Sequence, residues 1–436
     1  MHILKNCISL LTFLMLLQSS VVYANGYHFL HQSAEGFGSA YAANGTAIND
    51  ISAMFSNPAS ITRFDGARLS TGVALDFPRS EFTNVAATSY TGARVTGNPA
   101  SPAQPIDTAF GAATYATYQL NDDVYLGLSL NAPFAYVSEY PETAASRYQA
   151  TMTELFAYNV NGVVAYKVNK QLSIAASINL QYYDSVLNTQ LPTTPDTPSS
   201  LTDVGSQIKA GDLGYGFSLG AEYQLNQQTR LGISYRSKIN HSFKGDVKFV
   251  GEADNLSTLQ DALSLSSLSG KANFDISTPS MLQVGVLHKI TDKVELYGNA
   301  NLFGWSAFKD TQIEFNNGFP DVIVDNGWDD SWWLALGAGY QYSEKLKLRT
   351  GVAYDWSPTP SNTVSPRAPN DDRMYAALGL SYVMSKKWKF DAGYLFILFE
   401  EAEVRLAGGN NAPRGDLSGD LNLYANVFMF QINRTL

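Results

Sequence analysis

The feature that most restricts the fold is a series of segments in which apolar and polar residues alternate, as in 388–398, where Trp388 and Phe390 share one face and Lys389 and Asp391 the other. A period of two is the pattern of a β-strand that separates two environments. Six connections between such segments are short, around 121–122, 169–170, 226–227, 291–292, 343–344 and 385–386. Seven are long, at about 79–104, 138–147, 189–210, 250–270, 315–327, 357–370 and 403–418.

Short and long connections follow each other strictly, and together they join fourteen strands. Barrels of the bacterial outer membrane have this arrangement, with an even number of strands, short periplasmic turns and longer external loops. A soluble Greek-key sandwich has the same period of two but no reason to alternate its connections. Charged residues make up only 16% of the chain, which also contains 25 Tyr and 23 Phe. We therefore predict an all-β fold, a transmembrane antiparallel β-barrel of about 14 strands in the outer membrane.

The N-terminus has the pattern of an export signal. Lys5 precedes a short apolar run over 8–17, and Ala24 follows as a small residue at the expected cleavage point. We predict a signal peptide over 1–24, cleaved before Asn25. Cys7, the single cysteine, lies inside it. The formal net charge of −10 argues against a nucleic-acid partner, which would favour a basic surface.

Residues 25–66 differ from the rest because they are rich in Gly and Ala and show no sustained alternation. They also contain more large apolar side chains than a disordered leader would: Ile48, Ile51, Met54, Phe55 and Ile61. A fourteen-stranded barrel leaves a lumen that its own side chains do not fill. We therefore predict a hatch over 25–66 that folds inside a barrel formed by 67–436.

Three groups of motifs carry a resemblance to a known family. The first is Ser33-Ala34-Glu35-Gly36-Phe37-Gly38-Ser39-Ala40-Tyr41-Ala42, followed by Asn57-Pro58-Ala59. The second is Asn131-Ala132-Pro133-Phe134, followed by Glu139-Tyr140-Pro141 and Ser146-Arg147-Tyr148. The third is Tyr354-Asp355-Trp356-Ser357-Pro358, followed by Asp371-Asp372-Arg373-Met374-Tyr375. With these motifs in order, the chain resembles the FadL family of outer-membrane long-chain fatty acid transporters, which also includes aromatic-hydrocarbon transporters.

The resemblance implies that the first motif group belongs to the hatch, with Gly36, Phe37, Gly38, Asn57, Pro58 and Ala59 among its residues. It implies uptake of hydrophobic molecules, most simply long-chain fatty acids, by a monomer that works in outer-membrane lipid after insertion by the barrel assembly machinery. One departure is that Tyr182-Tyr183-Asp184 stands where some members carry a basic residue for the ligand carboxylate. Uptake of aromatic hydrocarbons or alkanes is therefore an alternative, and so is a porin for polar solutes, although a porin gains nothing from a hatch.

Transport of an apolar molecule needs a dry pocket and, for a fatty acid, a cation for the carboxylate. The basic candidates next to the matched motifs are Arg147, Arg236, Lys309 and Arg373. Two predicted external loops carry apolar residues at helical spacing, namely Leu201, Val204 and Ile208 in one and Leu256, Leu259 and Leu263 in the other. We expect one short helix in each loop and a ligand-capture groove between them, or else packing of both on the barrel rim.

The third predicted strand contains a proline. Pro133 lacks the amide hydrogen that a barrel strand donates to its neighbour, so it fits a bulge or kink, or a position beyond the ladder at the rim. A kink would leave backbone groups unpaired in lipid unless protein covers them, and the hatch is the nearest candidate. Because the resembled family has a kink in its third strand, we expect Asn131, Ala132, Pro133 and Phe134 to form a lateral exit.

The sequence offers little for catalysis. His28 and His31 have a spacing that can share a metal, but no further ligand is recognisable nearby. His241 and His288 could each serve as a base in an outer-membrane hydrolase, yet no nucleophile motif accompanies them. We therefore expect no enzyme activity, no metal and no cofactor.

Overall fold

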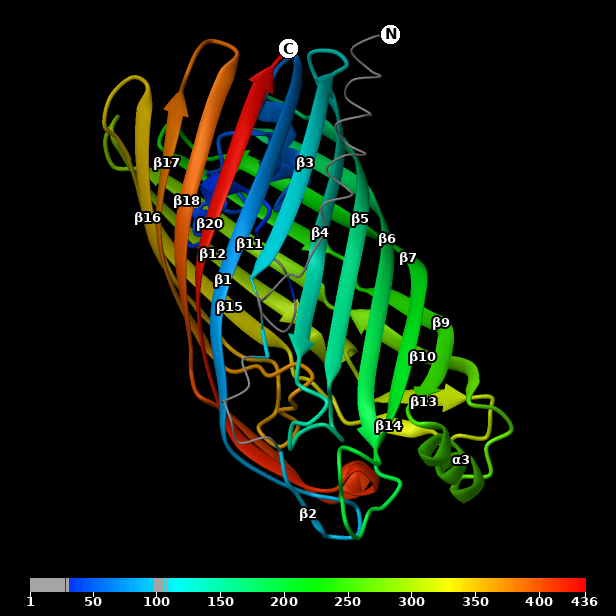
Figure 1. The fold of residues 1–436 in the computed structure, drawn as a ribbon. Helices are drawn as coiled ribbons and strands as arrows, with labels where there is room; N and C mark the ends of the chain where they lie inside the picture. The colour runs from blue at the N-terminus through cyan, green and yellow to red at the C-terminus, as the bar shows by residue number, and fades with distance from the viewer. Residues whose placement is uncertain (1–27, 29–30, 98–104, 107) are drawn as a thin grey trace.

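The computed structural model describes His28 and residues 31–97, 105–106 and 108–436, so the predicted signal peptide lies outside the described residues. The described chain forms a closed antiparallel barrel (Figure 1), in which the first strand, β1 (Ala67–Thr88), pairs with the last, β20 (Leu417–Thr435). No helix among these residues is long and apolar enough to cross a membrane.

The described residues form fourteen barrel strands, which confirms the predicted number. Between β1 and β20 they are β3 (Ala109–Gln119), β4 (Val124–Glu139), β5 (Met152–Lys167), β6 (Leu172–Leu191), β7 (Val204–Gln224), β8 (Thr229–Arg236) with β9 (Ile239–Val250), β10 (Ser269–Thr278) with β11 (Ser280–Lys289), β12 (Val294–Gly304) with β13 (Thr311–Phe315), β15 (Ser331–Gln341), β16 (Leu346–Asp355), β17 (Arg373–Val383), and β18 (Trp388–Phe399) with β19 (Ala402–Leu406). Each pair of labels linked by "with" denotes one barrel strand that is interrupted along its length. Two short strands, β2 (Arg94–Val95) and β14 (Val322–Val324), pair outside the barrel ladder.

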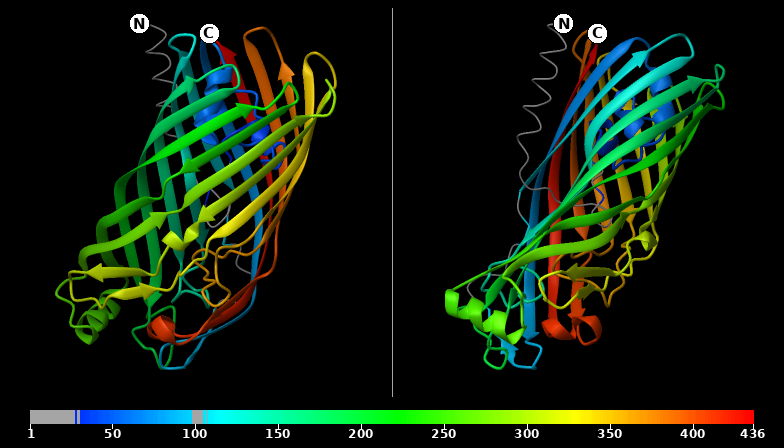
Figure 2. Two further views of the ribbon diagram at one scale, coloured as in Figure 1. Left: turned by 180° about the vertical axis from the view of Figure 1, so that it is seen from behind. Right: turned by 90° about the vertical axis from the view of Figure 1, so that its right-hand side faces the viewer.

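The two ends of the barrel differ. The six short turns and the C-terminus lie at one end, and the long loops with helix α3 (Ala253–Ala262) lie at the other, as the two further views in Figure 2 also show. By the rule for outer-membrane barrels, the end with short turns faces the periplasm. The strands reach farther at the external end than the sequence predicts, since β1 continues to Thr88 and β7 begins at Val204.

The outward face of β7 shows where the membrane lies. Leu213 and Tyr215, 65% and 79% exposed, begin an apolar row that ends at Tyr223. At about 3.3 Å per residue and a tilt of about 45°, this row covers roughly 23 Å, close to the apolar band of about 25 Å in such barrels. Beyond Leu213 the outward residues become polar, while the inward Val204 and Ile208 are buried and apolar. We call this change the polarity switch.

The polarity switch corrects one prediction. The expected helix over Leu201, Val204 and Ile208 is wrong, because Leu201 lies in a turn with its side chain 84% exposed, and the other two belong to β7. Val204 and Ile208 are four residues apart because both belong to the inward face of a strand, where every second residue points the same way. Leu201, in the turn before the strand, lies three residues earlier, so the three residues together have the spacing of a helix face. The second helix is present as α3, which holds Leu256 and Leu259 and has Leu263 as its C-cap.

Residues 31–66 lie inside the barrel, with nearly all side chains buried. They form three short helices, α2 (Ala34–Phe37), η1 (Ile51–Phe55) and η2 (Pro58–Arg63). A polar side chain caps each of them, because Ser33, Asp50 and Asn57 accept hydrogen bonds from backbone N–H groups in the first turn. Asn57 also donates from Nδ2 to the backbone oxygens of Gly45 and Ala221, so the Asn-Pro-Ala motif joins this segment to β7.

A buried ionic cluster fastens the same segment to the opposite wall. The ammonium group of Lys389, on β18, contacts three carboxylates: Glu35 Oε1 at 2.5 Å, Asp50 Oδ2 at 3.3 Å and Asp391 Oδ2 at 3.3 Å. Arg349 Nη2 lies 2.9 Å from Glu35 Oε1. The three carboxylates are close enough together to hold a metal ion, but the lysine already supplies the cation between them.

Candidate functional site

A largely apolar cavity lies beneath the external loops, beyond the polarity switch. Its volume is about 130 Å³, and its wall comes from the external parts of β5, β6, β7, β10 and β13 and from the loops around 359–368. Inward residues of the strands supply the apolar lining: Leu155, Leu187, Leu191, Ile208, Phe274, Ile276, Ile313 and Phe315. The reversed polarity of the external strand segments therefore creates this cavity.

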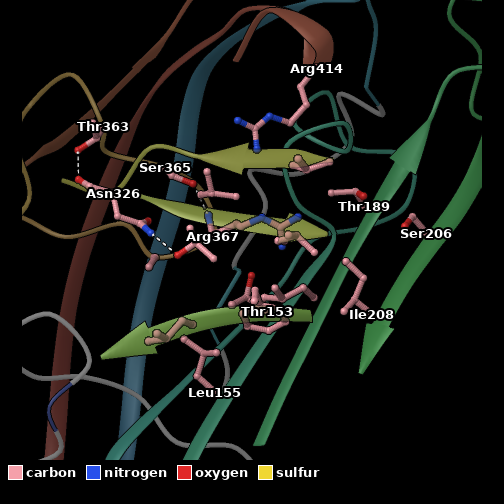
Figure 3. A pocket seen from close by; sticks show the side chains of 18 of the residues that line it. Thr153, Leu155, Thr189, Ser206, Ile208, Asn326, Thr363, Ser365, Arg367 and Arg414 are labelled. Atoms are coloured by element: carbon pink, nitrogen blue, oxygen red, sulfur yellow. Dashed lines mark hydrogen bonds between the residues drawn. The ribbon is translucent and has the colours of Figure 1, made fainter. Parts of the chain in front are cut away.

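Two arginines from different loops reach the cavity (Figure 3). Arg367 and Arg414 lie on one side of it and Leu155 on the other. Burial, together with the nearby Arg414 guanidinium, lowers the pKa of Arg367 to about 9, and burial also lowers the pKa of Arg414. An arginine side chain stays protonated at neutral pH, and two like charges side by side in a partly apolar site favour binding of an anion.

Neither arginine is fully compensated by the residues that the structure describes. No acidic side chain among them lies within ion-pair distance of Arg367 or Arg414, although the Asp325 carboxylate is near enough to Arg414 to oppose part of the lowering of its pKa. Arg367 Nη1 and Arg414 Nε are buried without a hydrogen-bond partner, although Arg414 Nη2 donates to the backbone oxygen of Ile323 at 3.3 Å. Buried donors without acceptors cost free energy until a ligand supplies an acceptor.

A second, more polar cavity of about 460 Å³ opens among the external loops and shares part of its lining with the first. Thr363, Ser365, Arg367 and Arg414 line both cavities. The arginines therefore stand between a polar entrance and an apolar chamber, a suitable position for the head group of an amphiphile whose tail enters the chamber.

Aromatic rings continue from the apolar cavity toward the middle of the barrel. Trp328 and Phe308, both in the cavity lining, have ring centroids 4.9 Å and 6.4 Å from Trp305. Trp305 is fully buried, and its ring centroid lies 6.2 Å from that of Phe134 on β4. A chain of aromatic contacts thus joins the cavity to the third strand.

Strand β4 contains the irregularity that Pro133 predicts. Its register with β5 shifts between Asn131 and Phe134. Its pairing with β3 ends at Leu130, and the residues of β3 before Thr114 pair only with β1 among the described residues. The wall is therefore discontinuous between the second and third barrel strands.

The N-terminal segment covers this discontinuity from inside. His28 pairs with Phe134 as an isolated antiparallel bridge. Gln32 Nε2 donates to the backbone oxygen of Ala132 at 3.0 Å, and the Tyr115 hydroxyl donates to the backbone oxygen of Gln32 at 2.8 Å. The bridge to Phe134 and the bond to Ala132 pair backbone groups at the kink that β3 leaves unpaired, and the Tyr115 bond holds Gln32 beside them.

Comparison with known proteins identifies the family of this chain. The profile of the outer membrane transport protein family OMPP1/FadL/TodX matches residues 15–436, nearly the whole chain. The chain belongs to this family.

Relatives match this chain over most of its length and most of their own. Outer membrane protein P1 of Haemophilus influenzae is 26% identical, with 98% of each chain covered, and the long-chain fatty acid transport protein of Escherichia coli K12 is 24% identical, covering 88% of this chain and 90% of the relative. The crystal structure of a Pseudomonas aeruginosa FadL homologue superposes with a TM-score of 0.85 at 23% identity, covering 94% of this chain and 99% of that one. The toluene transporter TodX of Pseudomonas putida gives 0.63 at 16% identity, with coverage of 92% and 98%.

The basic residues predicted to meet a carboxylate lie elsewhere in the transporter. Arg147 Nε lies 2.6 Å from Asp203 Oδ2 in a buried ion pair, and Arg236 Nη2 donates to the backbone oxygen of Phe55 at 2.7 Å. Lys309 is exposed. Arg373 is buried beside Asp355 and hydrogen-bonded to Asn370. None of the four lines the apolar cavity.

The two arginines that do line the cavity were missed by sequence reasoning, because neither adjoins a matched motif. A weak signal was available. Each follows a proline in a predicted long external loop, in Pro366-Arg367 and Pro413-Arg414. A proline fixes its own φ angle and so restricts the loop backbone next to each arginine.

The leucines predicted to capture the ligand pack at the external end of the barrel. Leu259 is buried against the core that lines the cavity, Leu256 and Leu263 pack beside it, and Asn255 Nδ2 donates to the backbone oxygen of Leu201 at 3.1 Å, which joins the two loops.

His28 and His31 pack against aromatic rings, His241 bonds to Gln181 and Asp212, and His288 bonds to Thr229 at the periplasmic end.

Proposed function

We propose that this outer-membrane transport protein takes up hydrophobic molecules with an anionic head group, of which long-chain fatty acids are the simplest class. The carrying observation is the apolar cavity with two guanidinium groups at its entrance, neither of which forms an ion pair with the described residues. An arginine binds a carboxylate with two parallel charge-assisted hydrogen bonds, and the apolar lining excludes the water that would compete. The names of the fatty acid transport proteins among the relatives support the same class.

The proposed route begins at the external loops and ends in the bilayer. The head group binds at Arg367 and Arg414 while the tail enters the cavity. The ligand then passes the rings of Phe308 and Trp305 to reach Phe134 at the kink. From there it leaves sideways between β3 and β4, where strand pairing is interrupted, so that an apolar tail reaches lipid without crossing the periplasmic half of the lumen. In this scheme the hatch blocks the lumen and lines the exit.

The test is a binding measurement on purified protein in mild detergent. The double variant Arg367→Gln with Arg414→Gln should bind a long-chain fatty acid about tenfold to a hundredfold more weakly, because a hydrogen bond to a charged group contributes about 1.5–3 kcal/mol. Binding of an alkane of equal chain length should be unchanged. The matched control, Arg79→Gln with Arg94→Gln, removes two exposed arginines and should bind both ligands as the wild type does.

An equal loss for the fatty acid and the alkane would contradict head-group recognition by these arginines and would indicate damage to the cavity. Unchanged fatty-acid binding would favour the second candidate, uptake of neutral aromatic hydrocarbons. That candidate draws its support from the rings of Phe308, Trp305 and Trp328 along the route and from the likeness in fold to the toluene transporter.

A further inference from the structure

A short β-hairpin covers one side of the apolar cavity at the external end of the barrel (Figure 1). Strands β13 and β14 pair with each other from Thr311 opposite Val324 to Ile313 opposite Val322. Alternation along the strands turns one face of the hairpin to the cavity and leaves the other exposed. The side chains of the hairpin that line the cavity are Thr311, Ile313, Phe315, Phe319, Val322 and Val324. We call residues 311–324 the hairpin lid.

The two edges of the hairpin lid are attached to the barrel very differently. Along the β13 edge the lid pairs with β10 at two positions, and two bonds extend this attachment: Asn317 Nδ2 donates to the backbone oxygen of Ser267 at 3.0 Å, and Asn316 Oδ1 accepts from the backbone N–H of Lys271 at 2.7 Å. The β14 edge pairs with no barrel strand among the described residues. Because an isolated two-stranded hairpin is only marginally stable in water, the lid can swing about its β10 side more easily than a barrel strand can move.

The free edge is closed by the loop that carries Arg414, whose guanidinium group extends toward the lid in Figure 3. Arg414 Nη2 donates to the backbone oxygen of Ile323 on β14 at 3.3 Å, and Asn410 Nδ2 donates to Oδ1 of Asp325, directly after β14, at 2.6 Å. The arginine bond is long for a hydrogen bond between nitrogen and oxygen. A carboxylate binds a guanidinium group with two bonds of about 2.7–2.9 Å. An anionic head group at this arginine therefore competes favourably with the carbonyl group of Ile323.

The same edge borders the passage between the two cavities. Five residues line both the apolar chamber and the polar entrance: Val324 on β14, Thr363, Ser365, Arg367 and Arg414. With the lid in this position the chamber has a volume of about 130 Å³, below the roughly 300–1,000 Å³ of pockets for drug-sized ligands. A long acyl tail therefore needs a larger chamber, and the weakly attached β14 edge is the part of the wall that can yield. Outward movement of this edge widens the passage and enlarges the chamber together.

We propose that the hairpin lid is a gate, which Arg414 holds shut and which an anionic head group opens by taking the guanidinium group away from Ile323. The gate thereby selects an amphiphile by the charge of its head group before the tail enters the chamber. A neutral molecule of the same length offers Arg414 nothing stronger than the carbonyl group that it already binds, so such a molecule enters slowly. The inference rests on the proposed function, because the same arginine binds the head group, and it adds the lid as the element that responds.

A crosslink across the free edge tests the gate. The pair Asp325→Cys with Asn410→Cys, joined by a short thiol-to-thiol crosslinker, ties the β14 edge to the loop that carries Arg414, since the two native side chains are hydrogen-bonded. Stopped-flow fluorescence should show that parinaric acid, an intrinsically fluorescent long-chain fatty acid, associates at least about tenfold more slowly, because binding then lacks the conformational change that it requires. The neutral parinaryl alcohol should associate at the same slow rate with and without the crosslink.

The matched control crosslinks the lid to itself. Gln312 and Ile323 lie opposite each other on the two lid strands, and both are exposed. Gln312→Cys with Ile323→Cys, joined by the same reagent, should leave both association rates as in the wild type, because it ties no part of the lid to the barrel. Cys7→Ser in every variant removes the only native cysteine from the experiment.

Removal of the latch should move the two probes in opposite directions. Arg414→Gln should let parinaryl alcohol enter and leave several-fold faster than in the wild type, since the β14 edge loses its bond, while parinaric acid binds more weakly. Damage to the chamber would instead weaken the binding of both probes. Arg405→Gln is the control and should change neither probe, because Arg405 also lines the polar entrance but forms ion pairs with Glu403 and Asp420.

Association of parinaric acid at the wild-type rate in the crosslinked Asp325 and Asn410 variant overturns the gate. An equal change for acid and alcohol in Arg414→Gln also overturns it, because the head group would then have no part in opening the lid. Failure of the proposed function has a different signature: the wild type would bind the acid no more tightly than the alcohol, whether or not the lid is crosslinked. Heat-modified migration on gels shows that each variant has folded, so a changed rate is not a loss of the barrel.

Discussion

Gly38 in the hatch and Gly379 on β17 approach each other so closely that neither position has room for a side chain. A Cβ atom on Gly38 would lie 2.6 Å from Gly379 Cα, and one on Gly379 would lie 2.7 Å from Gly38 Cα. Both contacts are with backbone, which cannot rotate away as a side chain can. Two bare backbones in contact thus hold the hatch against the wall, close to the cluster around Lys389.

Gly379→Ala should loosen this contact while the barrel still forms. We expect greater susceptibility of the hatch to added protease and a several-fold rise in the conductance of polar ions through reconstituted protein. Gly162→Ala is the matched control, because a Cβ there meets nothing within 4 Å, and it should behave as the wild type. Identical conductance for both variants would show that the contact between the two glycines does not seat the hatch.

Single residues are also where prediction from the sequence reached its limit. Whether an arginine is available to a ligand depends on a partner that can come from anywhere in the chain. Arg147 adjoins a matched motif, yet Asp203, 56 residues later, occupies it. Arg367 and Arg414 are distant in sequence and share one cavity only because two external loops fold over the same opening. No local pattern records either relationship.

Among the elements, the interruption of β4 can be predicted from the sequence pattern, and the start of β7 cannot. The interruption in β4 was predictable because proline removes a hydrogen-bond donor in any context. The start of β7 was not, because its external part has apolar residues inside and polar residues outside, the reverse of its membrane part. The sequence analysis assumes that apolar residues face outward along the whole strand. It therefore predicts that a long strand ends near the membrane surface and that its external part is a loop.

The kink in β4 leads to a prediction about the exit. Ala132→Trp or Ala135→Trp should fill the space beside Phe134 and slow the uptake of fatty acid strongly, because both alanines are buried where the wall is discontinuous. Ala376→Trp, which adds the same bulk to the exposed face of β17, should take up fatty acid at the wild-type rate. Uptake at that rate by folded Ala132 and Ala135 variants would exclude a lateral exit at this position.

At the scale of the molecule, the barrel and the hatch differ in how far the sequence predicts them. The barrel closes on itself through β1 and β20, so its ring of strands is complete without the N-terminal segment. Fourteen strands and their alternating connections were predictable because both follow from local pattern. The docking of the hatch could be predicted only as a location, since its contacts pair residues hundreds of positions apart, such as Ala34 with Gln431.

Deletion of residues 28–60 should therefore leave a folded barrel with an open lumen. We expect a large increase in permeability to small polar solutes, measured as single-channel conductance in planar bilayers or as swelling of proteoliposomes. Trypsin resistance and heat-modified migration would verify that the shortened protein is folded. If its conductance equals that of the intact protein, the segment does not obstruct the lumen.

The polarity switch on β7 also fixes how deep the protein can sit in a bilayer. Moving the barrel outward would expose Leu213 and Tyr215 to water, and moving it inward would bring Lys209 into hydrocarbon. Each displacement is opposed, at fractions of a kcal/mol per Å of mismatch. In a bilayer of different hydrophobic thickness, lipid near this wall would therefore have to stretch or thin while the capture cavity kept its height above the surface. The reach of the loops into the surrounding water is thus set by lipid as much as by the chain.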